Sequence, residues 1–191
     1  MQVENISIKD IDKSLLKANY VSNNEISTTL YLSFLLGRPM LIEGPPGVGK
    51  TELAKVVAEA FDRDFFRIQC YEGITFEQIV GEWNYQKQLL HLEAAKQDSN
   101  REDKIFDEEF FIRRPLLNAF LNEKDSVLLI DEIDKADLEF PNDLLWELDQ
   151  MEFYINETKQ TVKAKHRPIV IITSNAEKEL PDAFLRRCIF H

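Results

Sequence analysis

Four short and almost wholly apolar runs stand out along the chain, at about residues 39–43, 65–69, 126–131 and 168–174. Continuous apolar runs of this length are typical of strands covered on both faces, because a strand with one exposed face alternates apolar and polar residues. Segments with apolar residues at helical spacing separate the runs. The order strand, helix, strand therefore predicts an α/β fold with a parallel sheet.

The segments outside these runs complete the predicted organisation. Residues 1–36 are expected to be helical, with the mostly apolar stretch 26–36 packed against a core that spans residues 37–191. Residues 95–109 are polar and charged, and we predict that they form a solvated loop or insertion. Residues 152–167 contain two alternating runs around a polar turn, which is the pattern of a β-hairpin.

A glycine-rich motif follows the first apolar run. Residues 44–51 read GPPGVGKT and match G-x-x-x-x-G-K-[ST] at every fixed position, between a strand pattern and a helix pattern. The glycines let the backbone curl so that successive N–H groups face an anion, and the helix N-terminus adds partial positive charge. Lys50 can reach the β- and γ-phosphates of a nucleotide, and the Thr51 hydroxyl can ligate Mg²⁺. The other candidate binding residues are Gly44, Pro45, Pro46, Gly47, Val48 and Gly49.

Two acids, Asp131 and Glu132, end the third apolar run. Ligands bind at the carboxyl ends of the strands in open α/β sheets, so both side chains are expected in the same crevice as the motif. Asp131 is suited to hold Mg²⁺ through water, and Glu132 is suited to orient and deprotonate a water that attacks the γ-phosphate. Without the glycine-rich motif upstream, an acid pair facing solvent would explain the same residues equally well.

Two later features could complete such a site. The fourth apolar run leads to Asn175, whose amide could hydrogen-bond the attacking water or the γ-phosphate, although asparagine is also common as a turn residue or helix cap. Arg186 and Arg187 follow a short helical pattern. They are either surface charge or the source of a guanidinium that reaches a phosphate in a neighbouring subunit. Spacing alone does not choose between these alternatives.

The composition of the chain limits the classes of binding partner and the cellular compartment that we expect. The net charge of −11 argues against duplex DNA or a membrane surface, since both favour basic proteins. Cys70 and Cys188 lie far apart beside apolar residues, which is typical of buried free thiols in a cytosolic protein, and no cysteine–histidine spacing indicates zinc. The sequence shows neither a signal-peptide pattern nor an apolar run of the ~20 residues that span a membrane. We therefore predict a cytoplasmic protein without a membrane or nucleic-acid partner.

Taken in order, the motifs resemble those of an AAA+ ATPase over about residues 26–191. Their details are most similar to the MoxR-type branch and, within it, to the CoxD-like subgroup. The elements similar to the family's Walker A, Walker B, sensor-1 and arginine-finger motifs are, in that order, residues 44–51, 131–134, 173–175 and 185–187. The subgroup resemblance is carried by residues 69–73, 82–85, 113–116 and 179–183.

The resemblance implies a three-layer P-loop α/β/α sandwich whose parallel strands have the order 5-1-4-3-2. Hairpin insertions are implied in helix 2 and before sensor 1, near residues 95–109 and 152–167. Family members form hexameric rings that remodel a protein partner, often together with a von Willebrand A-type protein. The family's helical lid follows the arginine finger, and this chain ends at His191. We therefore expect a core without its lid, which would hydrolyse ATP poorly by itself.

The resemblance also implies ATP as the ligand, Mg²⁺ as the cofactor and Mg²⁺-dependent ATP hydrolysis as the activity. In this resemblance Lys50 and Thr51 bind the phosphates and Mg²⁺, and Asp131 supports the metal ion. Glu132 activates the attacking water, and Asn175 is the sensor. Arg186 or Arg187 is the arginine finger, which acts on the ATP of the next subunit.

Three other functions are open at the level of the sequence. A GTP-driven motor of the McrB type has this fold and a similar loop, but the acidic charge and the absence of a basic arm count against it. A small-molecule P-loop kinase seldom needs Asp131 and Glu132 together with a distant Asn175 and an arginine finger. A nucleotide-binding module that does not hydrolyse and serves only interactions would fit a core without a lid.

Overall fold

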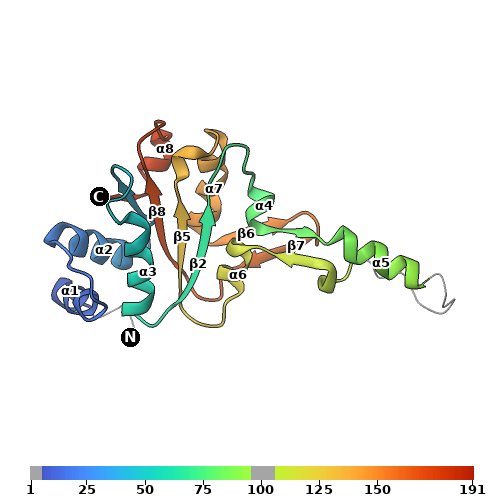
Figure 1. Ribbon diagram of the computed structural model, residues 1–191, viewed down its shortest axis with the longest axis horizontal. Helices are drawn as coiled ribbons and strands as arrows, with labels where there is room; N and C mark the ends of the chain where they lie inside the picture. The colour runs from blue at the N-terminus through green and yellow to red at the C-terminus, as the bar shows by residue number, and fades with distance from the viewer. Residues whose placement is uncertain (1–5, 96–105) are drawn as a thin grey trace.

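The computed structural model describes residues 6–95 and 106–191, and it is built around one parallel sheet of five strands (Figure 1). The strands are β1 (Met40–Glu43), β2 (Asp64–Gln69), β5 (Ser126–Asp131), β8 (Ile169–Ser174) and β9 (Ile189–Phe190). They lie side by side in the order β2–β5–β8–β1–β9. Numbered along the chain and read from the β9 edge, the five strands have the order 5-1-4-3-2, which confirms the predicted α/β fold.

Strand register brings the polar ends of these strands to one edge of the sheet. β5 and β8 are buried at every residue, as central strands with helices on both sides should be. Gln69 at the end of β2 pairs with Asp131 at the end of β5, and Glu43 of β1 pairs with Ser174 of β8. The carboxyl ends of these four strands therefore share one edge, which is where ligands bind in sheets of this type.

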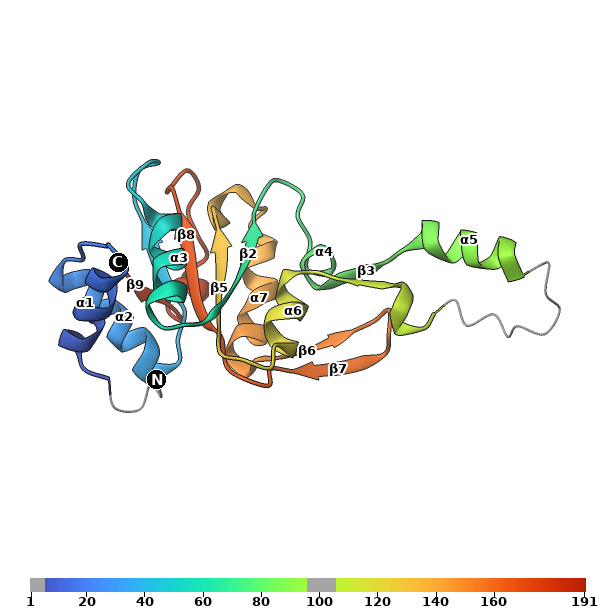
Figure 2. The same ribbon diagram turned by 60° about the horizontal axis from the view of Figure 1, so that its bottom comes forward.

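Three helices lie on one side of the sheet (Figure 2). Their buried residues form one cluster with alternate residues of β1 and β5. The helices are α1 (Ile8–Lys17), α2 (Asn24–Leu36) and α3 (Lys50–Ala60). A capping box begins α1, and the side chain of Asn23 accepts a hydrogen bond at the start of α2. The two N-terminal helices confirm the helical character predicted for this segment, within residues 6–36. Its division from the core stays a prediction.

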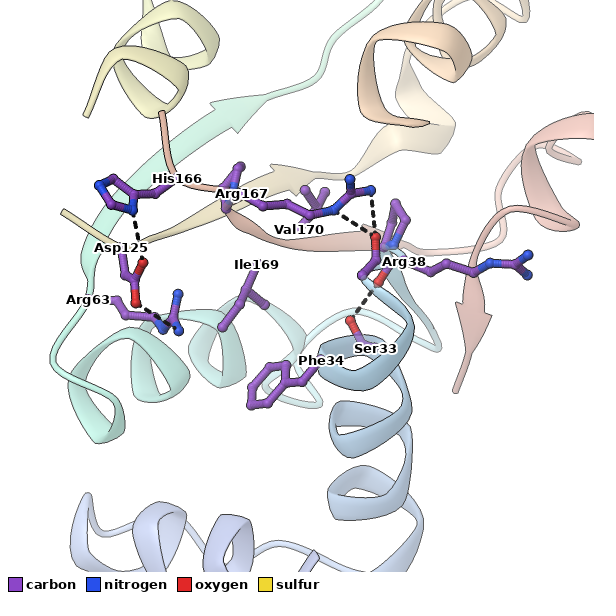
Figure 3. A pocket seen from close by; sticks show the side chains of 12 residues that line it. Ser33, Phe34, Arg38, Arg63, Asp125, His166, Arg167, Ile169 and Val170 are labelled. Atoms are coloured by element: carbon purple, nitrogen blue, oxygen red, sulfur yellow. Dashed lines mark hydrogen bonds and ion pairs between the residues drawn. The ribbon is translucent and has the colours of Figure 1, made fainter. Parts of the chain in front are cut away.

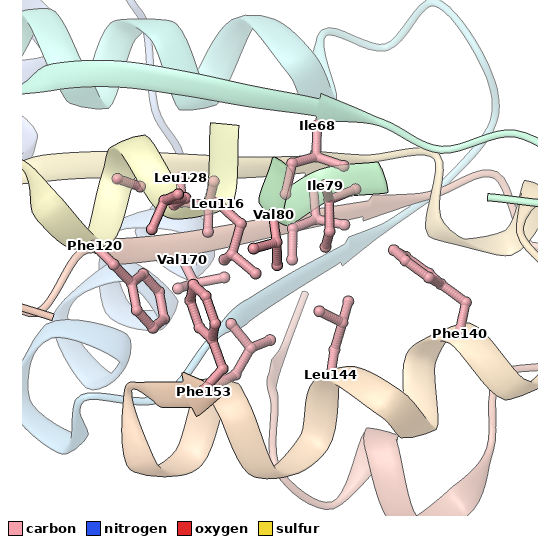
Figure 4. Close-up of a cluster of buried hydrophobic side chains, with 14 of the residues drawn as sticks. Ile68, Ile79, Val80, Leu116, Phe120, Leu128, Phe140, Leu144, Phe153 and Val170 are labelled. Carbon is pink, nitrogen blue, oxygen red and sulfur yellow. The ribbon is translucent and has the colours of Figure 1, made fainter. Parts of the chain in front are cut away.

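A second buried cluster fills the opposite face of the sheet (Figure 4). It contains residues from α4 (Phe76–Val80), α6 (Pro115–Leu121) and α7 (Glu139–Gln150). Leu128 and Ile130 of β5 belong to this cluster and alternate with the β5 residues of the first one, as the two-residue repeat of a strand requires. Each large apolar side chain buried completely here stabilises the fold by about 1.5–3 kcal/mol. The sheet is thus held rigidly between two layers.

A short antiparallel hairpin extends the second layer. β6 (Glu152–Ile155) and β7 (Gln160–Lys163) form it, which confirms the hairpin predicted for residues 152–167. Phe153 and Val162 pair across the hairpin, and both are buried in the second cluster. One face of the hairpin therefore belongs to the body of the protein.

The sequence pattern does not predict a second hairpin, which the structure contains. β3 (Gly81–Trp83) pairs with β4 (Phe111–Arg113), and helix α5 (Tyr85–Ala95) continues from β3 away from the body (Figures 1 and 2). We call these three elements the arm. The predicted polar insertion at 95–109 falls largely on residues 96–105, which lie outside the described residues. Three-residue strands are too short to show an alternating pattern, so nothing in the sequence marks them.

Two expectations drawn from composition can be checked directly. Both cysteines are free, which confirms the predicted thiols; Cys70 is buried and Cys188 is partly buried. Burial raises the pKa of each thiol to about 12, and the carboxylates of Asp131, Asp134 and Glu132 add to the effect at Cys70. In the part of the chain that the structure describes, no helix is both long enough and apolar enough to cross a bilayer.

Candidate nucleotide site

The glycine-rich motif forms a loop between β1 and α3 at the carboxyl edge of the sheet. Gly47 and Gly49 have φ angles of 85° and 92°, in the left-handed region that other residues rarely adopt. Space is not the constraint, because an added Cβ at either position would meet no atom within 4 Å. The N–H of Gly44 donates to the carbonyl of Ser174 at 3.2 Å and ties the loop to β8. The loop and the first turn of α3 therefore have the backbone form that binds an anion.

Lys50, the first residue of α3, is 9% exposed. Its ammonium donates to the carbonyls of Gly44 at 2.6 Å and Pro45 at 2.9 Å, and to Oδ1 of Asn175 at 2.9 Å. An ammonium has three donors, so all of them are engaged. Lys50 lies between the loop and the end of β8, where phosphate oxygens could replace the two carbonyls as acceptors.

Asp131 is the last residue of β5 and is 2% exposed. The Thr51 hydroxyl donates to its Oδ1 at 2.9 Å, and the Thr173 hydroxyl donates to the same oxygen at 2.6 Å. A hydroxyl that donates to Asp131 keeps its lone pairs for a metal ion, so Thr51 and Asp131 fit the small, hard Mg²⁺. Within residues 6–95 and 106–191, no three His, Cys, Asp or Glu side chains are grouped to hold a metal. Mg²⁺ usually takes most of its ligands from water and phosphate, and two protein oxygens suit it.

Glu132 follows Asp131 and has a φ of 56°, which is uncommon for a residue other than glycine. Its N–H donates to the hydroxyl of Thr173 at 2.8 Å, so the turn after β5 is fixed from β8. Its carboxylate accepts from Nε2 of Gln69 at 3.0 Å and from Nδ2 of Asn175 at 3.5 Å. The carboxylate therefore lies beside Asn175, at the edge of the space in front of Lys50.

Asn175 is positioned through its backbone as well as its side chain. Its N–H donates to Oδ2 of Asp134 at 3.1 Å, and the N–H of Glu177 donates to the same oxygen at 3.0 Å. Asp134 is 1% exposed, and its other carboxylate oxygen has no hydrogen-bond partner in the described structure. The amide of Asn175 thus bridges Lys50 and Glu132, with Asp134 holding the backbone behind it.

Sequence reasoning missed two residues of this site, Arg67 and Gln69. The guanidinium of Arg67 donates to Oδ2 of Asp131 from Nε at 3.0 Å and from Nη2 at 2.6 Å, and Gln69 donates to Glu132. A usable signal was present, because both polar residues interrupt an otherwise apolar strand run at positions two apart. Such residues share one face of a strand, and they lie near its carboxyl end.

One pocket of about 290 Å³ collects most of the predicted residues. It is lined by Lys50, Thr51, Asp131, Glu132 and Asn175, together with residues of the loop. The predicted arginines are not among its lining residues. The structure therefore brings together five of the seven side chains to which the resemblance gives a role.

The two arginines follow the short helix α8 (Asp182–Leu185) and differ in their contacts. Nε of Arg187 lies 2.6 Å from Oδ2 of Asp149, and its Nη1 donates to the carbonyl of Ala183 at 3.0 Å. The side chain of Arg186 is exposed, and among the described residues it makes no hydrogen bond or ion pair.

A different pocket, of about 330 Å³, lies at the amino ends of the strands (Figure 3). Two of its charged groups, Arg63 and Arg167, serve the fold. Arg167 donates from Nε at 3.0 Å and from Nη2 at 2.7 Å to the carbonyl of Gly37, the residue that ends α2. Arg63 forms an ion pair with Asp125 at 3.2 Å. These arginines are satisfied within the chain, so we assign this pocket a structural role.

Comparison with known proteins relates the chain to nucleotide-dependent enzymes. A protein-family model described as "AAA domain (dynein-related subfamily)" matches residues 39–188. A crystal structure of an inferred ATPase from Cytophaga hutchinsonii superimposes with a TM-score of 0.53 over 96% of this chain and 54% of that chain. The two sequences are 19% identical, so this likeness shows the fold alone.

Two curated relatives match parts of the chain. A mitochondrial Lon protease homolog of Drosophila melanogaster is 38% identical over 64 residues, which are 34% of this chain and 6% of that protein. An uncharacterised protein of Staphylococcus saprophyticus is 26% identical over 123 residues, which are 64% of this chain and 41% of that protein. The chain thus spans less than half the length of either curated relative.

Proposed function

The chain belongs to the AAA domain family, in its dynein-related subfamily. On that basis we propose that it binds ATP with Mg²⁺ and hydrolyses the bond between the β- and γ-phosphates. The observation that carries the proposal is the single pocket lined by Lys50, Thr51, Asp131, Glu132 and Asn175. These residues supply a cation for the phosphates, two oxygens for a metal ion, and a carboxylate with a neighbouring amide for a water.

Binding would begin at the loop. Its backbone N–H groups and the ammonium of Lys50 would hold the β- and γ-phosphates, with phosphate oxygens replacing the carbonyls that now accept from Lys50. Mg²⁺ would be held by Thr51 and Asp131, and when bound it would neutralise charge on the phosphates.

Glu132 is the candidate general base. A water beside its carboxylate would lose a proton to Glu132 while its oxygen attacks the γ-phosphorus, and the bond to the bridging β–γ oxygen would break. Asn175 would hold the water or the γ-phosphate, since its amide already bridges Lys50 and Glu132. Gln69 holds Glu132 from the side of β2, so Glu132 would have to leave that hydrogen bond to meet the water.

A second, smaller pocket beside the loop is the candidate site for the base of the nucleotide. It measures about 180 Å³, and apolar side chains that include Tyr20, Ile26, Val48 and Leu53 line it together with polar residues. Burial raises the pKa of Tyr20, so its neutral ring is available for stacking over a wide pH range. A flat aromatic base fits such a lining better than a charged group would.

Between the two arginines, we propose Arg186 as the finger that reaches the ATP of a neighbouring subunit. Its guanidinium is exposed and unpaired among the described residues, whereas Arg187 is held by Asp149 within its own chain. In an assembled protein, Arg186→Gln is expected to lower turnover more than Arg187→Gln. The reverse ranking would make Arg187 the finger.

The resemblance carries the proposal further, to a MoxR-type, CoxD-like ATPase. In this proposal the full-length protein works in the cytoplasm as a homomeric ring, with six subunits as the expected number. ATP hydrolysis would remodel or mature a client protein, for which a von Willebrand A-type protein is the candidate. Size-exclusion chromatography with light scattering in the presence of ATP tests the ring directly. A protein that stays monomeric with nucleotide bound would contradict it.

Nucleotide binding provides the decisive test of the proposed function. Titration with a fluorescent ATP analogue should give saturable binding that unlabelled ATP displaces better than GTP. Lys50→Ala should weaken binding by at least about thirtyfold, because it removes a charge-assisted contact from a buried site. The matched control is Lys55→Ala, since Lys55 lies on the same helix with an exposed side chain 3.3 Å from Glu52. Preferential displacement by GTP would favour the McrB-type motor instead.

A further inference from the structure

Arg67 places a positive charge on Asp131, the carboxylate that is expected to hold the metal ion of the nucleotide site. Its guanidinium donates to Oδ2 of Asp131 from Nη2 at 2.6 Å and from Nε at 3.0 Å. Asp131 is 2% exposed, whereas the side chain of Arg67 is 45% exposed. A carboxylate buried this deeply needs a counter-charge, and Arg67 provides it.

The remaining contacts of Asp131 explain why Arg67 and a metal ion compete. Oδ1 accepts from the hydroxyls of Thr51 and Thr173. Oδ2 accepts from two N–H groups of the guanidinium, and from the Thr51 hydroxyl at the longer distance of 3.2 Å. A divalent cation beside Thr51 would face the guanidinium across this one carboxylate. Two cations so close repel each other, and the exposure of the Arg67 side chain screens only part of that repulsion because Asp131 itself is buried.

We propose that Arg67 is an exchangeable counter-cation, which neutralises Asp131 until Mg²⁺ arrives with the nucleotide and then withdraws. The inference rests on the proposed function, and it adds a residue that sets the selectivity of the site. Mg²⁺ alone has to displace Arg67 without help, whereas the phosphates of a nucleotide add negative charge that favours the divalent ion. Arg67 thus makes the site select the Mg²⁺–nucleotide complex over free Mg²⁺.

The released side chain has room beside its present position. A pocket of about 270 Å³ adjoins β2 and is lined by Arg67, Gln78 and Glu82, among other residues. Its acceptors are already engaged, since Glu82 pairs with Arg114 and the amide oxygen of Gln78 accepts from the Thr75 N–H at 3.1 Å and the Tyr71 hydroxyl at 3.2 Å. The released guanidinium would therefore share Glu82 with Arg114. Withdrawal from Asp131 therefore needs a change of side-chain conformation and no unfolding of β2.

The test compares Arg67→Gln with a matched control, Arg113→Gln. Arg113 has a similarly exposed side chain, 48%, and pairs with Glu108 at 3.3 Å on the arm. Binding of a fluorescent ADP analogue is titrated with Mg²⁺ at fixed nucleotide, and is repeated in EDTA. For Arg67→Gln the Mg²⁺ midpoint, which is the Mg²⁺ concentration that gives half of the maximal binding, should fall at least about tenfold, because the variant loses charge-assisted hydrogen bonds to Asp131. Its affinity for the ADP analogue in EDTA should not change. Arg113→Gln should leave the midpoint in place, and Arg67→Lys, which keeps the charge, should stay close to the parent protein.

A second readout needs no nucleotide. Mn²⁺, which takes the same oxygen ligands as Mg²⁺, is followed by its electron paramagnetic resonance signal on addition to the protein alone. Arg67→Gln should gain a bound Mn²⁺ that the parent protein lacks. If Arg67→Gln had an unchanged Mg²⁺ midpoint and gained no bound Mn²⁺, the proposal that Arg67 exchanges with the metal ion would be wrong. A raised midpoint would show instead that Arg67 aligns Asp131 for the metal ion. If the parent protein bound no nucleotide in either Mg²⁺ or EDTA, the proposed function would be wrong. The Mn²⁺ result would still decide the role of Arg67.

Discussion

Asp134 offers a way to displace Asn175 without changing any group that would contact nucleotide. Its Oδ2 accepts the N–H groups of Asn175 at 3.1 Å and Glu177 at 3.0 Å, and the side chain is 1% exposed. Asp134→Ala removes this acceptor and leaves the chain after β8 without its anchor. We expect both a loss of stability and a specific loss of turnover.

The size of the stability loss follows from these contacts. A hydrogen bond to a charged group contributes about 1.5–3 kcal/mol, but the N–H of the exposed Glu177 can return to water and costs less. The unpaired Oδ1 of Asp134 is itself unfavourable when buried, and its removal offsets part of the loss. The net destabilisation is therefore about 2–4 kcal/mol, which corresponds to a Tm lower by roughly 5–12 °C for a domain of this size.

Urea unfolding, nucleotide titration and an ATPase assay together measure the effect. Nucleotide affinity should change by less than about threefold, because Lys50 keeps its charge and its contacts to the loop carbonyls, while kcat should fall by at least about tenfold as Asn175 moves. Asp137→Ala is the matched control, since Asp137 makes one exposed bond of 3.2 Å to the N–H of Gly73. If Asp134→Ala and Asp137→Ala unfold at the same urea concentration, the anchoring role of Asp134 is wrong.

Four further outcomes are expected. Glu132→Gln should keep ATP affinity and slow hydrolysis at least about a hundredfold in a phosphate-release assay; normal turnover would remove Glu132 from its role as base. Gly81→Ala should destabilise the protein by about 1–3 kcal/mol in thermal unfolding, because a new Cβ would clash with the ring of Phe111. Iodoacetamide at pH 8 should leave Cys70 unmodified until the protein unfolds, as judged by mass spectrometry, since burial raises its pKa to about 12. The raised pKa values of Cys70 and Cys188 also predict stability that is complete below pH 9.0 and is lost as the pH rises towards about 12, because the unfolded thiols ionise first.

The central sheet could be predicted because each of its buried strands is a continuous apolar run that ends in a polar residue. The order of the strands came from the resemblance, since no local pattern in the sequence says that β1 lies between β8 and β9. The sequence pattern could not predict the arm, and only the resemblance implied a hairpin near residues 95–109, because the pairing depends on contacts such as Trp83 against Phe111, whose ring centroids lie 5.3 Å apart. Those contacts join residues that are distant in the chain and carry no periodic signal.

The residues of the candidate site also fall into two groups, those that the sequence predicts and those that only the structure reveals. Lys50, Thr51, Asp131 and Glu132 belong to motifs with fixed spacing, so the sequence identified them without reference to neighbours in space. The partners that restrain the two acids come from β2, whose register against β5 only the structure reveals. The sequence likewise left Arg186 and Arg187 equivalent, because the ion pair that separates them involves the distant Asp149.

Hydrogen exchange at residues 70–84 provides a final prediction, which connects the acids to the arm. β2 lies at the edge of the sheet and pairs with β5 alone, so its end is held by that backbone pairing and by the contacts of Arg67 to Asp131 and Gln69 to Glu132. The chain runs from β2 through α4 directly into β3 of the arm. Loss of the Arg67 contact on binding of Mg²⁺ and nucleotide should therefore speed exchange in this segment, and Arg67→Gln should exchange faster even before nucleotide is added. Equal exchange in Arg67→Gln and Arg113→Gln would show that the end of β2 is held by its strand pairing, and that the acids do not act on the arm through it.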